Sequence, residues 1–175
     1  MFSARDHHCE LRVAVQRTGD DGFALYYELR NLARQRLFVL DGVMPAEAPY
    51  YVEREGDFVV LSQKLFPVPG GLLVERPEVP LAALVEPGQR LRHKLEITLP
   101  LRESIPYPHL LPKRGRSQGY VVMDAAFELG YFADVQPEAE QKAGEGFFLP
   151  GFSVKQQTLL RAGPIGRVAF DPVRR

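Results

Sequence analysis

The 175-residue sequence has no tryptophan, a single cysteine (Cys9) and no long hydrophobic run. One cysteine excludes an intrachain disulfide and fits a reducing compartment. No stretch of about 18 apolar residues continues without charge or proline, so we expect no membrane-spanning helix. Residues 1–13, MFSARDHHCELRV, also lack the apolar run that a secretory signal needs. We therefore expect a cytoplasmic protein without membrane association.

An excess of charge of one sign is also missing, because 22 Lys and Arg balance 22 Asp and Glu. Zero net charge provides no overall field that attracts nucleic acid or anionic lipid, so neither partner is expected. The charge is uneven only locally: residues 89–120 contain seven basic and two acidic side chains. Polyanion binding through this basic segment stays as a third hypothesis, which the neutral total charge disfavours.

Signatures of common catalytic and cofactor sites are missing as well. No serine sits in a G-x-S-x-G elbow, and the glycine-rich phosphate loops G-x-x-x-x-G-K and G-x-G-x-x-G do not occur. We expect no cofactor and assign no catalytic residue. The alternative is a small-ligand or hydrolytic enzyme whose site is assembled from distant loops. A pocket that holds at least two of the following residues would favour that alternative: His93, His109, Ser117, Asp124 and Glu128.

The sequence DHHCE, residues 6–10, places five potential metal ligands in a row. On an extended chain, neighbouring side chains point to opposite faces. Only His7 with Cys9, or Asp6 with His8, would then converge, and a closed site would need ligands from elsewhere. We therefore expect a solvated polar segment that leads into the first strand, and we predict no metal site.

Alternation of apolar and polar residues is the strongest structural signal that is present. Residues 91–99, LRHKLEITL, place Leu91, His93, Leu95, Ile97 and Leu99 on one side and charged or polar residues on the other. This period of two predicts a half-buried β-strand. His93 falls on the apolar side, where we expect a core or rim histidine and not a metal ligand.

Weaker alternation predicts a hairpin of residues 10–17 and 23–30, and further strands at 57–61, 81–85, 120–132, 152–160 and 165–170. With 15 Gly and 15 Pro, short elements joined by turns are favoured over long helices. Two sheets with one apolar face each must cover one another. We predict one all-β domain over residues 1–175, an antiparallel β-sandwich with long proline-rich loops and at most one short helix.

The strand count and turn spacing resemble the immunoglobulin-like class in general architecture, without its Cys, Trp and Cys framework. Residues 137–144 have the ends of a two-turn helix but no apolar stripe, so an exposed or disordered segment is preferred there. Residues 1–8 and 171–175 are expected to be frayed.

The connection 102–119 is the best candidate for a binding surface. It is longer than a typical loop and contains three prolines, together with basic and aromatic side chains. Such a loop suits a phosphate, a carboxylate or an acidic partner. The residues that we assign to this ligand or partner site are Tyr107, His109, Lys113, Arg114 and Arg116.

A second candidate surface is apolar. Residues 65–84 carry Leu, Val and Phe between four prolines, and Phe147, Phe148 and Phe152 surround Pro150. These side chains either close an oligomer or partner interface or cover the open ends of the sandwich. We interpret the chain as a non-catalytic binding or interaction module that uses its exposed loops, with homodimerisation as an expectation.

Overall fold

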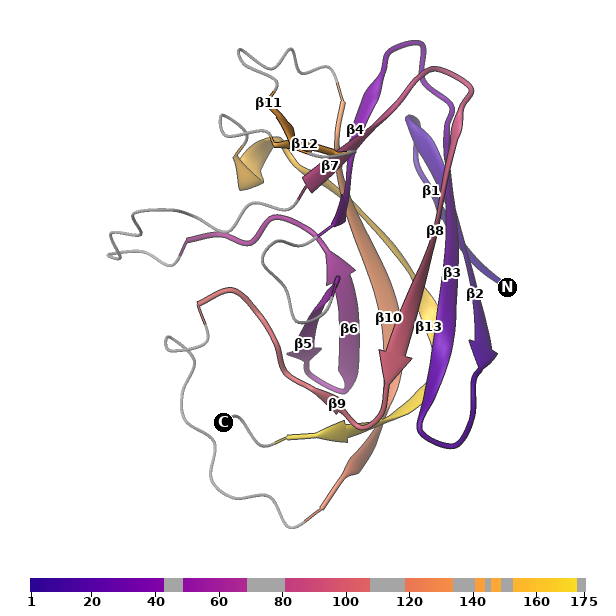
Figure 1. Cartoon of the computed structure of the whole chain (residues 1–175), viewed down its shortest axis with the longest axis vertical. Coiled ribbons are helices and arrows are strands. Elements are labelled where there is room, and N and C mark those ends of the chain that lie inside the picture. The colour runs from indigo at the N-terminus through magenta and orange to yellow at the C-terminus, as the bar shows by residue number, and fades with distance from the viewer. Residues whose placement is uncertain are drawn as a thin grey trace.

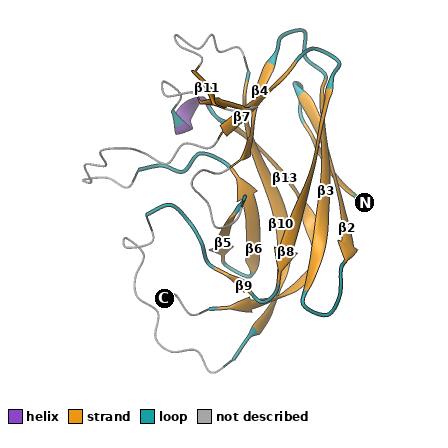
Figure 2. Cartoon of the chain, viewed as in Figure 1, coloured by secondary structure: helices purple, strands orange, loops and turns teal. Residues whose placement is uncertain are grey.

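Two β-sheets account for most of the chain in the computed structural model (Figures 1 and 2). The structure describes residues 1–42, 49–68, 81–107, 119–133, 141–143, 146–148 and 153–172. Within these ranges the only helical turn is a short 3-10 helix, η2 (Val154–Gln156). The prediction of an all-β chain with at most one short helix is confirmed for the described residues.

Sheet A contains four antiparallel strands in the order β1-β2-β3-β8. Their bounds are β1 (Phe2–Arg5), β2 (Cys9–Arg17), β3 (Gly22–Asn31) and β8 (Arg90–Thr98). The predicted hairpin is confirmed as β2 and β3, and the predicted strand at 91–99 is confirmed as β8. In β8, Leu95 and Ile97 are buried whereas Arg92, Lys94 and Glu96 are exposed, as the alternation requires.

Sheet B has the strand order β11-β12-β7-β4-β10-β13-β9, and β6, with β5 at its side, also pairs with β10. The bounds are β4 (Leu37–Gly42), β5 (Tyr51–Glu55), β6 (Phe58–Gln63), β7 (Leu81–Val85), β9 (Leu101–Arg102), β10 (Val121–Phe132), β11 (Gln141–Ala143), β12 (Gly146–Phe148) and β13 (Thr158–Asp171). The prediction of purely antiparallel sheets is wrong for sheet B. It is a mixed sheet, because β6 runs parallel to β10 and β9 runs parallel to β13.

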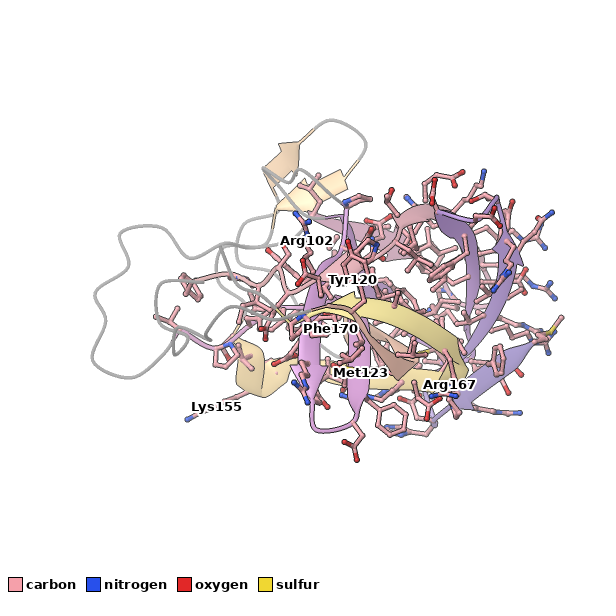
Figure 3. All side chains as sticks on the ribbon, turned by 90° about the horizontal axis from the view of Figure 1, so that it is seen from below. Arg102, Tyr120, Met123, Lys155, Arg167 and Phe170 are labelled. Atoms are coloured by element: carbon pink, nitrogen blue, oxygen red, sulfur yellow. The ribbon has the colours of Figure 1, made fainter. Side chains whose placement is uncertain are left out.

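The main hydrophobic core lies between the two sheets. It combines alternate residues of sheet A with the inward residues of β10, which are Met123, Ala125, Phe127, Leu129 and Tyr131. Met123 and Phe170, both members of this core, are labelled in the view along the sheets (Figure 3). A buried hydrogen bond from Tyr27 Oη to Gln63 Oε1, 2.8 Å long, also links sheet A to sheet B. A register slip would turn these residues outward, so the core fixes the alignment of the strands.

A second, smaller core lies on the outer face of sheet B. It contains Phe38, Leu40, Leu65, Ala82 and Phe132, with Leu84 and Val154 packed against it. Phe132 is an even-numbered residue of β10, so it points away from sheet A. Sheet B is therefore covered on part of both faces, and this outer cover forms one wall of the candidate site.

Four local expectations differ from the structure. Residues 1–8 were expected to be frayed, but Phe2–Arg5 forms β1 and pairs with β2. The segment 137–144 contains the strand β11 and no helix over its described residues. The two strands expected at 152–160 and 165–170 are one strand, β13, which begins at Thr158 after η2. At the other end, Asp171 still belongs to β13, and 173–175 lie outside the described residues.

Candidate functional site

The predicted binding loop is described only at its two ends. Tyr107 lies within the described residues, whereas His109, Lys113, Arg114 and Arg116 lie outside them. The Tyr107 ring is buried, and its backbone has φ of 64°. A bulky residue in this left-handed region carries strain on the order of 1 kcal/mol or more, and such strain concentrates at functional sites. The region around Tyr107 is therefore a candidate functional site.

A pocket of about 330 Å³ opens beside Tyr107 on the outer face of sheet B. Its walls are mainly apolar, and two charged side chains, Glu53 from β5 and Lys64 just after β6, face into it. This combination of apolar walls and a few polar groups is typical of small-molecule sites. The other lining residues are Leu65, Phe66, Pro67, Ile105, Pro106, Tyr107, Val154, Gln157 and Leu159.

A network of ion pairs forms the polar side of this pocket. Lys64 Nζ lies 2.7 Å from Glu128 Oε1 and 3.0 Å from Glu53 Oε2. Arg161 bonds the other Glu128 oxygen at 2.8 Å and holds Glu55 with two hydrogen bonds of 2.7 and 2.9 Å. These residues come from β5, β10, β13 and the position just after β6, so the pairing of the strands assembles the network.

The network shifts the pKa values of Lys64, Glu55 and Arg161. Burial disfavours the charged form of Lys64, but its hydrogen bonds and charge interactions with Glu128 and Glu53 outweigh burial and raise its pKa. The hydrogen bond from Arg161 lowers the pKa of Glu55. In return, the bonds to Glu55 raise the pKa of Arg161. Lys64, Glu55 and Arg161 are therefore charged at neutral pH.

The charges in this network do not cancel. Three carboxylates, Glu53, Glu55 and Glu128, face two cations, Lys64 and Arg161. Lys64 is committed to two carboxylates, and its ammonium also lies over the Phe66 ring, 4.8 Å from the centroid. Glu53 keeps 26% of its side chain exposed and lines the pocket. The group that a ligand meets is thus a carboxylate with a surplus negative charge behind it.

Gln157 holds the apolar wall of the pocket in place. Its side-chain oxygen accepts a 2.6 Å hydrogen bond from the Leu65 backbone N–H, and its amide donates a 3.1 Å bond to the Leu65 carbonyl. The side chain fits because position 130 is glycine: a Cβ there would lie 2.4 Å from Gln157 Oε1. The segment 65–67, which lies outside the strands, is fixed in this way to Gln157, between η2 and β13.

No family model, curated protein or solved structure matches the chain. The function must therefore be inferred from the geometry of the site. Among the described residues no helix is long and apolar enough to cross a lipid bilayer.

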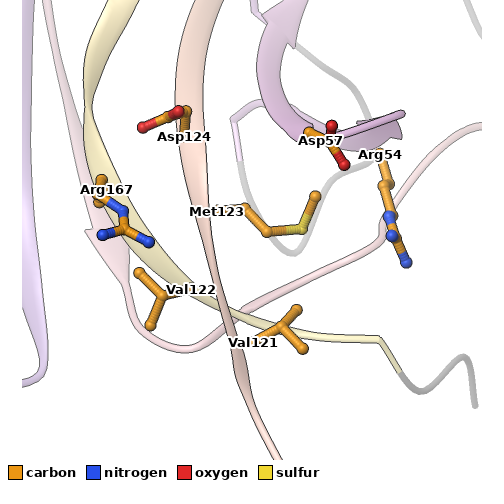
Figure 4. Close-up of a pocket in the computed structure, with 7 residues that line it drawn as sticks. All are labelled: Arg54, Asp57, Val121, Val122, Met123, Asp124 and Arg167. Carbon is orange, nitrogen blue, oxygen red and sulfur yellow. The ribbon is translucent and has the colours of Figure 1, made fainter.

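A larger and more open concavity, about 600 Å³, lies at the other end of β6 (Figure 4). Its lining places Arg54, Asp57, Asp124 and Arg167 around Val121, Val122 and Met123. Its two positive and two negative side chains balance. Residues 105–107 line the first pocket, and the start of β10, from Val121, lines this second one.

The residues named for an enzyme site do not converge within the described part of the chain. Glu128 belongs to the ion network, and Asp124 lines the open concavity. His93 is in sheet A, half-buried, and stacks on Tyr27 with centroids 5.8 Å apart, which confirms a histidine at the core rim. His109 and Ser117 lie outside the described residues.

The sequence analysis named Glu128 only for a hypothetical enzyme pocket and did not identify Lys64, Glu53 or Arg161, because alternation cannot tell a covered outer face from an exposed one. One signal was present: Glu128 is a carboxylate inside the apolar run of residues 125–132. A buried carboxylate requires a cationic partner.

Proposed function

We propose that the protein is a non-catalytic binding module whose pocket between β5, β6, residues 105–107 and η2 takes a small apolar ligand with a cationic head. The observation that carries this proposal is the position of Glu53, a partly exposed carboxylate at the edge of an apolar pocket of about 330 Å³. The volume lies within the range of small-molecule sites.

The charge balance of the network favours a cation over an anion. An added carboxylate would face Glu53, which is one of three negative charges already shared by only two cations. An added ammonium would bring the network to neutrality and donate a charge-assisted hydrogen bond to the Glu53 carboxylate. The aromatic rings of Phe66 and Tyr107 in the lining suit the apolar body of such a ligand.

The proposal also includes the fold, the cellular compartment and the self-association of the module. An immunoglobulin-like sandwich in the cytoplasm is supported by the two sheets that share one core and by the single cysteine. Self-association, expected from the apolar segments, stays a prediction that sedimentation at several protein concentrations tests.

The test uses three probes with the same aromatic body and different heads: phenethylammonium, 2-phenylethanol and 3-phenylpropionate. Binding to the full chain is followed by amide chemical shifts in two-dimensional NMR. We expect amide shifts at Lys64, Leu65, Phe66, Ile105 and Tyr107. The affinity should be about tenfold higher for the ammonium than for the alcohol, the usual contribution of one charged hydrogen bond. The carboxylate should bind most weakly.

Glu53→Gln is the decisive variant, because it keeps the size of the side chain and removes the charge. It should abolish the preference for phenethylammonium over 2-phenylethanol. Glu96→Gln is the matched control, since Glu96 is an exposed glutamate of β8 in sheet A. Equal affinity for all three probes, or an unchanged preference in Glu53→Gln, would refute the proposal.

A further inference from the structure

The segment between β1 and β2 is a tight turn and not an extended chain. The Asp6 N–H donates a 3.1 Å hydrogen bond to the Cys9 carbonyl. Asp6 Oδ1 accepts bonds from the backbone N–H groups of His8, at 2.8 Å, and Cys9, at 2.9 Å. This side-chain-to-backbone turn is typical of aspartate. It reverses the chain within four residues, so the alternation of faces does not apply here.

The turn brings three successive side chains together. One ligand atom each from Asp6, His7 and His8 lies within 4.8 Å of the others, and the two imidazole rings have centroids 3.8 Å apart. Tetrahedral zinc with ligand bonds of about 2.0–2.1 Å separates its ligand atoms by about 3.4 Å. The His7 ring is exposed, so a rotation of this ring closes the remaining distance without disturbing the core.

Tyr131 organises this cluster from β10. Its hydroxyl donates a 2.5 Å hydrogen bond to Asp6 Oδ2, and the hydroxyl oxygen of Tyr131 lies 3.1 Å from His8 Nδ1. Since the hydroxyl proton is committed to Asp6, His8 Nδ1 must carry the proton in the second bond. A neutral His8 then has its lone pair on Nε2, the form in which a second shell prepares a histidine for a metal.

The carboxylate of Asp6 is also held in a fixed orientation that suits metal binding. Its oxygens accept hydrogen bonds from the backbone N–H groups of His8 and Cys9 and from the Tyr131 hydroxyl, which fixes the orientation of the carboxylate. Two imidazoles and one monodentate carboxylate suit zinc, copper or nickel ions, whereas Mg²⁺ and Ca²⁺ prefer oxygen ligands.

We propose that Asp6, His7 and His8 bind one divalent transition-metal ion of the zinc class, with Tyr131 as the positioning residue. The sequence interpretation, which paired Asp6 only with His8, missed this site because it assumed an extended chain. Three protein ligands leave at least one coordination position to water. The Cys9 thiol belongs to the core between the sheets and is not a ligand.

Calorimetric titration of the untagged, metal-free full chain with ZnCl₂ at neutral pH tests the proposal. We expect saturable binding of one Zn²⁺ and none of Mg²⁺. His7→Ala should weaken zinc binding at least about tenfold while leaving the melting temperature of the metal-free protein unchanged, because His7 is exposed. Tyr131→Phe should keep the one-to-one stoichiometry and weaken binding about tenfold, the usual effect of a lost second-shell group.

Two controls separate this site from other ligands in the chain. His93→Gln and Cys9→Ser should bind Zn²⁺ as the wild type does, and the Co²⁺ form should show no thiolate charge-transfer band. The proposal fails if the wild type shows no saturable binding, if His7→Ala binds as tightly as the wild type, or if Cys9→Ser abolishes binding.

Discussion

Lys64 and Glu128 form an ion pair of 2.7 Å in which only 10% and 4% of the two side chains reach solvent. Removing two charges from water is costly, and close pairing with further partners is needed to offset that cost. Glu53 and Arg161 supply these partners. The pair is therefore sensitive to the loss of either member.

Lys64→Met should lower the free energy of unfolding by about 3 kcal/mol, because it leaves the buried Glu128 with only the half-exposed Arg161 as a partner. Urea denaturation at neutral pH measures this change. Lys94→Met, which removes a cation from an exposed pair with Glu96, is the matched control and should leave the midpoint unchanged. Equal losses of stability in Lys64→Met and Lys94→Met would contradict the prediction that the buried ion pair is the more sensitive of the two.

The environment of Asp6 predicts that the free energy of unfolding depends on pH in the acidic range. Burial alone would raise the pKa of Asp6, but the hydrogen bonds from Tyr131, Cys9 and His8 outweigh it and lower the pKa from 3.8. A depressed pKa contributes stability that is present above pH 3.8 and is lost as the pH falls through the folded value. Asp6→Asn should therefore have a lower free energy of unfolding than the wild type at neutral pH. In urea titrations this difference in free energy should narrow as the pH falls below 3.8. A constant difference down to pH 2 would show that the charge of Asp6 does not contribute.

Gly22 begins β3 where a side chain has no room. A Cβ at this position would lie 2.5 Å from the backbone oxygen of Ile97 in β8. Gly22→Ala should lower the free energy of unfolding by about 1–3 kcal/mol, since a backbone atom must move. Gly42→Ala is the control: its Cβ would make an ordinary 3.5 Å contact with Leu81. Thermal and urea unfolding of both variants measure the difference in stability between them. Equal stability of Gly22→Ala and Gly42→Ala would show that the β3–β8 pairing adjusts to the added methyl group at no cost.

Ser62 is buried in β6, and its hydroxyl has no hydrogen-bond partner among the described residues. A buried hydroxyl without a partner loses its hydration and gains nothing in return. Ser62→Ala should therefore leave stability unchanged or raise it by up to about 1 kcal/mol. A loss of more than about 1 kcal/mol in urea denaturation would reveal a partner for this hydroxyl.

Sequence patterns predicted the strands that have one wet face. β2, β3 and β8 alternate clearly because sheet A is covered on one side only. In β10 the alternation is weaker, since residues 125–132 are buried on both faces. Pairing partners could not be predicted: the parallel contact of β6 with β10 joins segments about 66 residues apart, and local periodicity does not record such contacts.

The candidate pocket was predicted in part: Tyr107 belongs to the predicted binding loop, and residues 65–67 belong to the predicted apolar surface. Its polar side combines residues of β5, β10 and β13 with Lys64 after β6, so these residues form no local motif. The turn at Asp6 was missed for the opposite reason. Its residues are adjacent, and the aspartate hydrogen bonds that reverse the chain were not recognised as competing with an extended strand.

β10 supplies one residue to each site, from opposite faces of the same strand. Tyr131 reaches through the core side to Asp6, and Glu128 reaches Lys64 on the outer side. A slip of β10 by one position would exchange its two faces and remove both contacts in a single step. The two sites therefore share one folding requirement, and a variant that misaligns this strand should lose zinc and amine binding together.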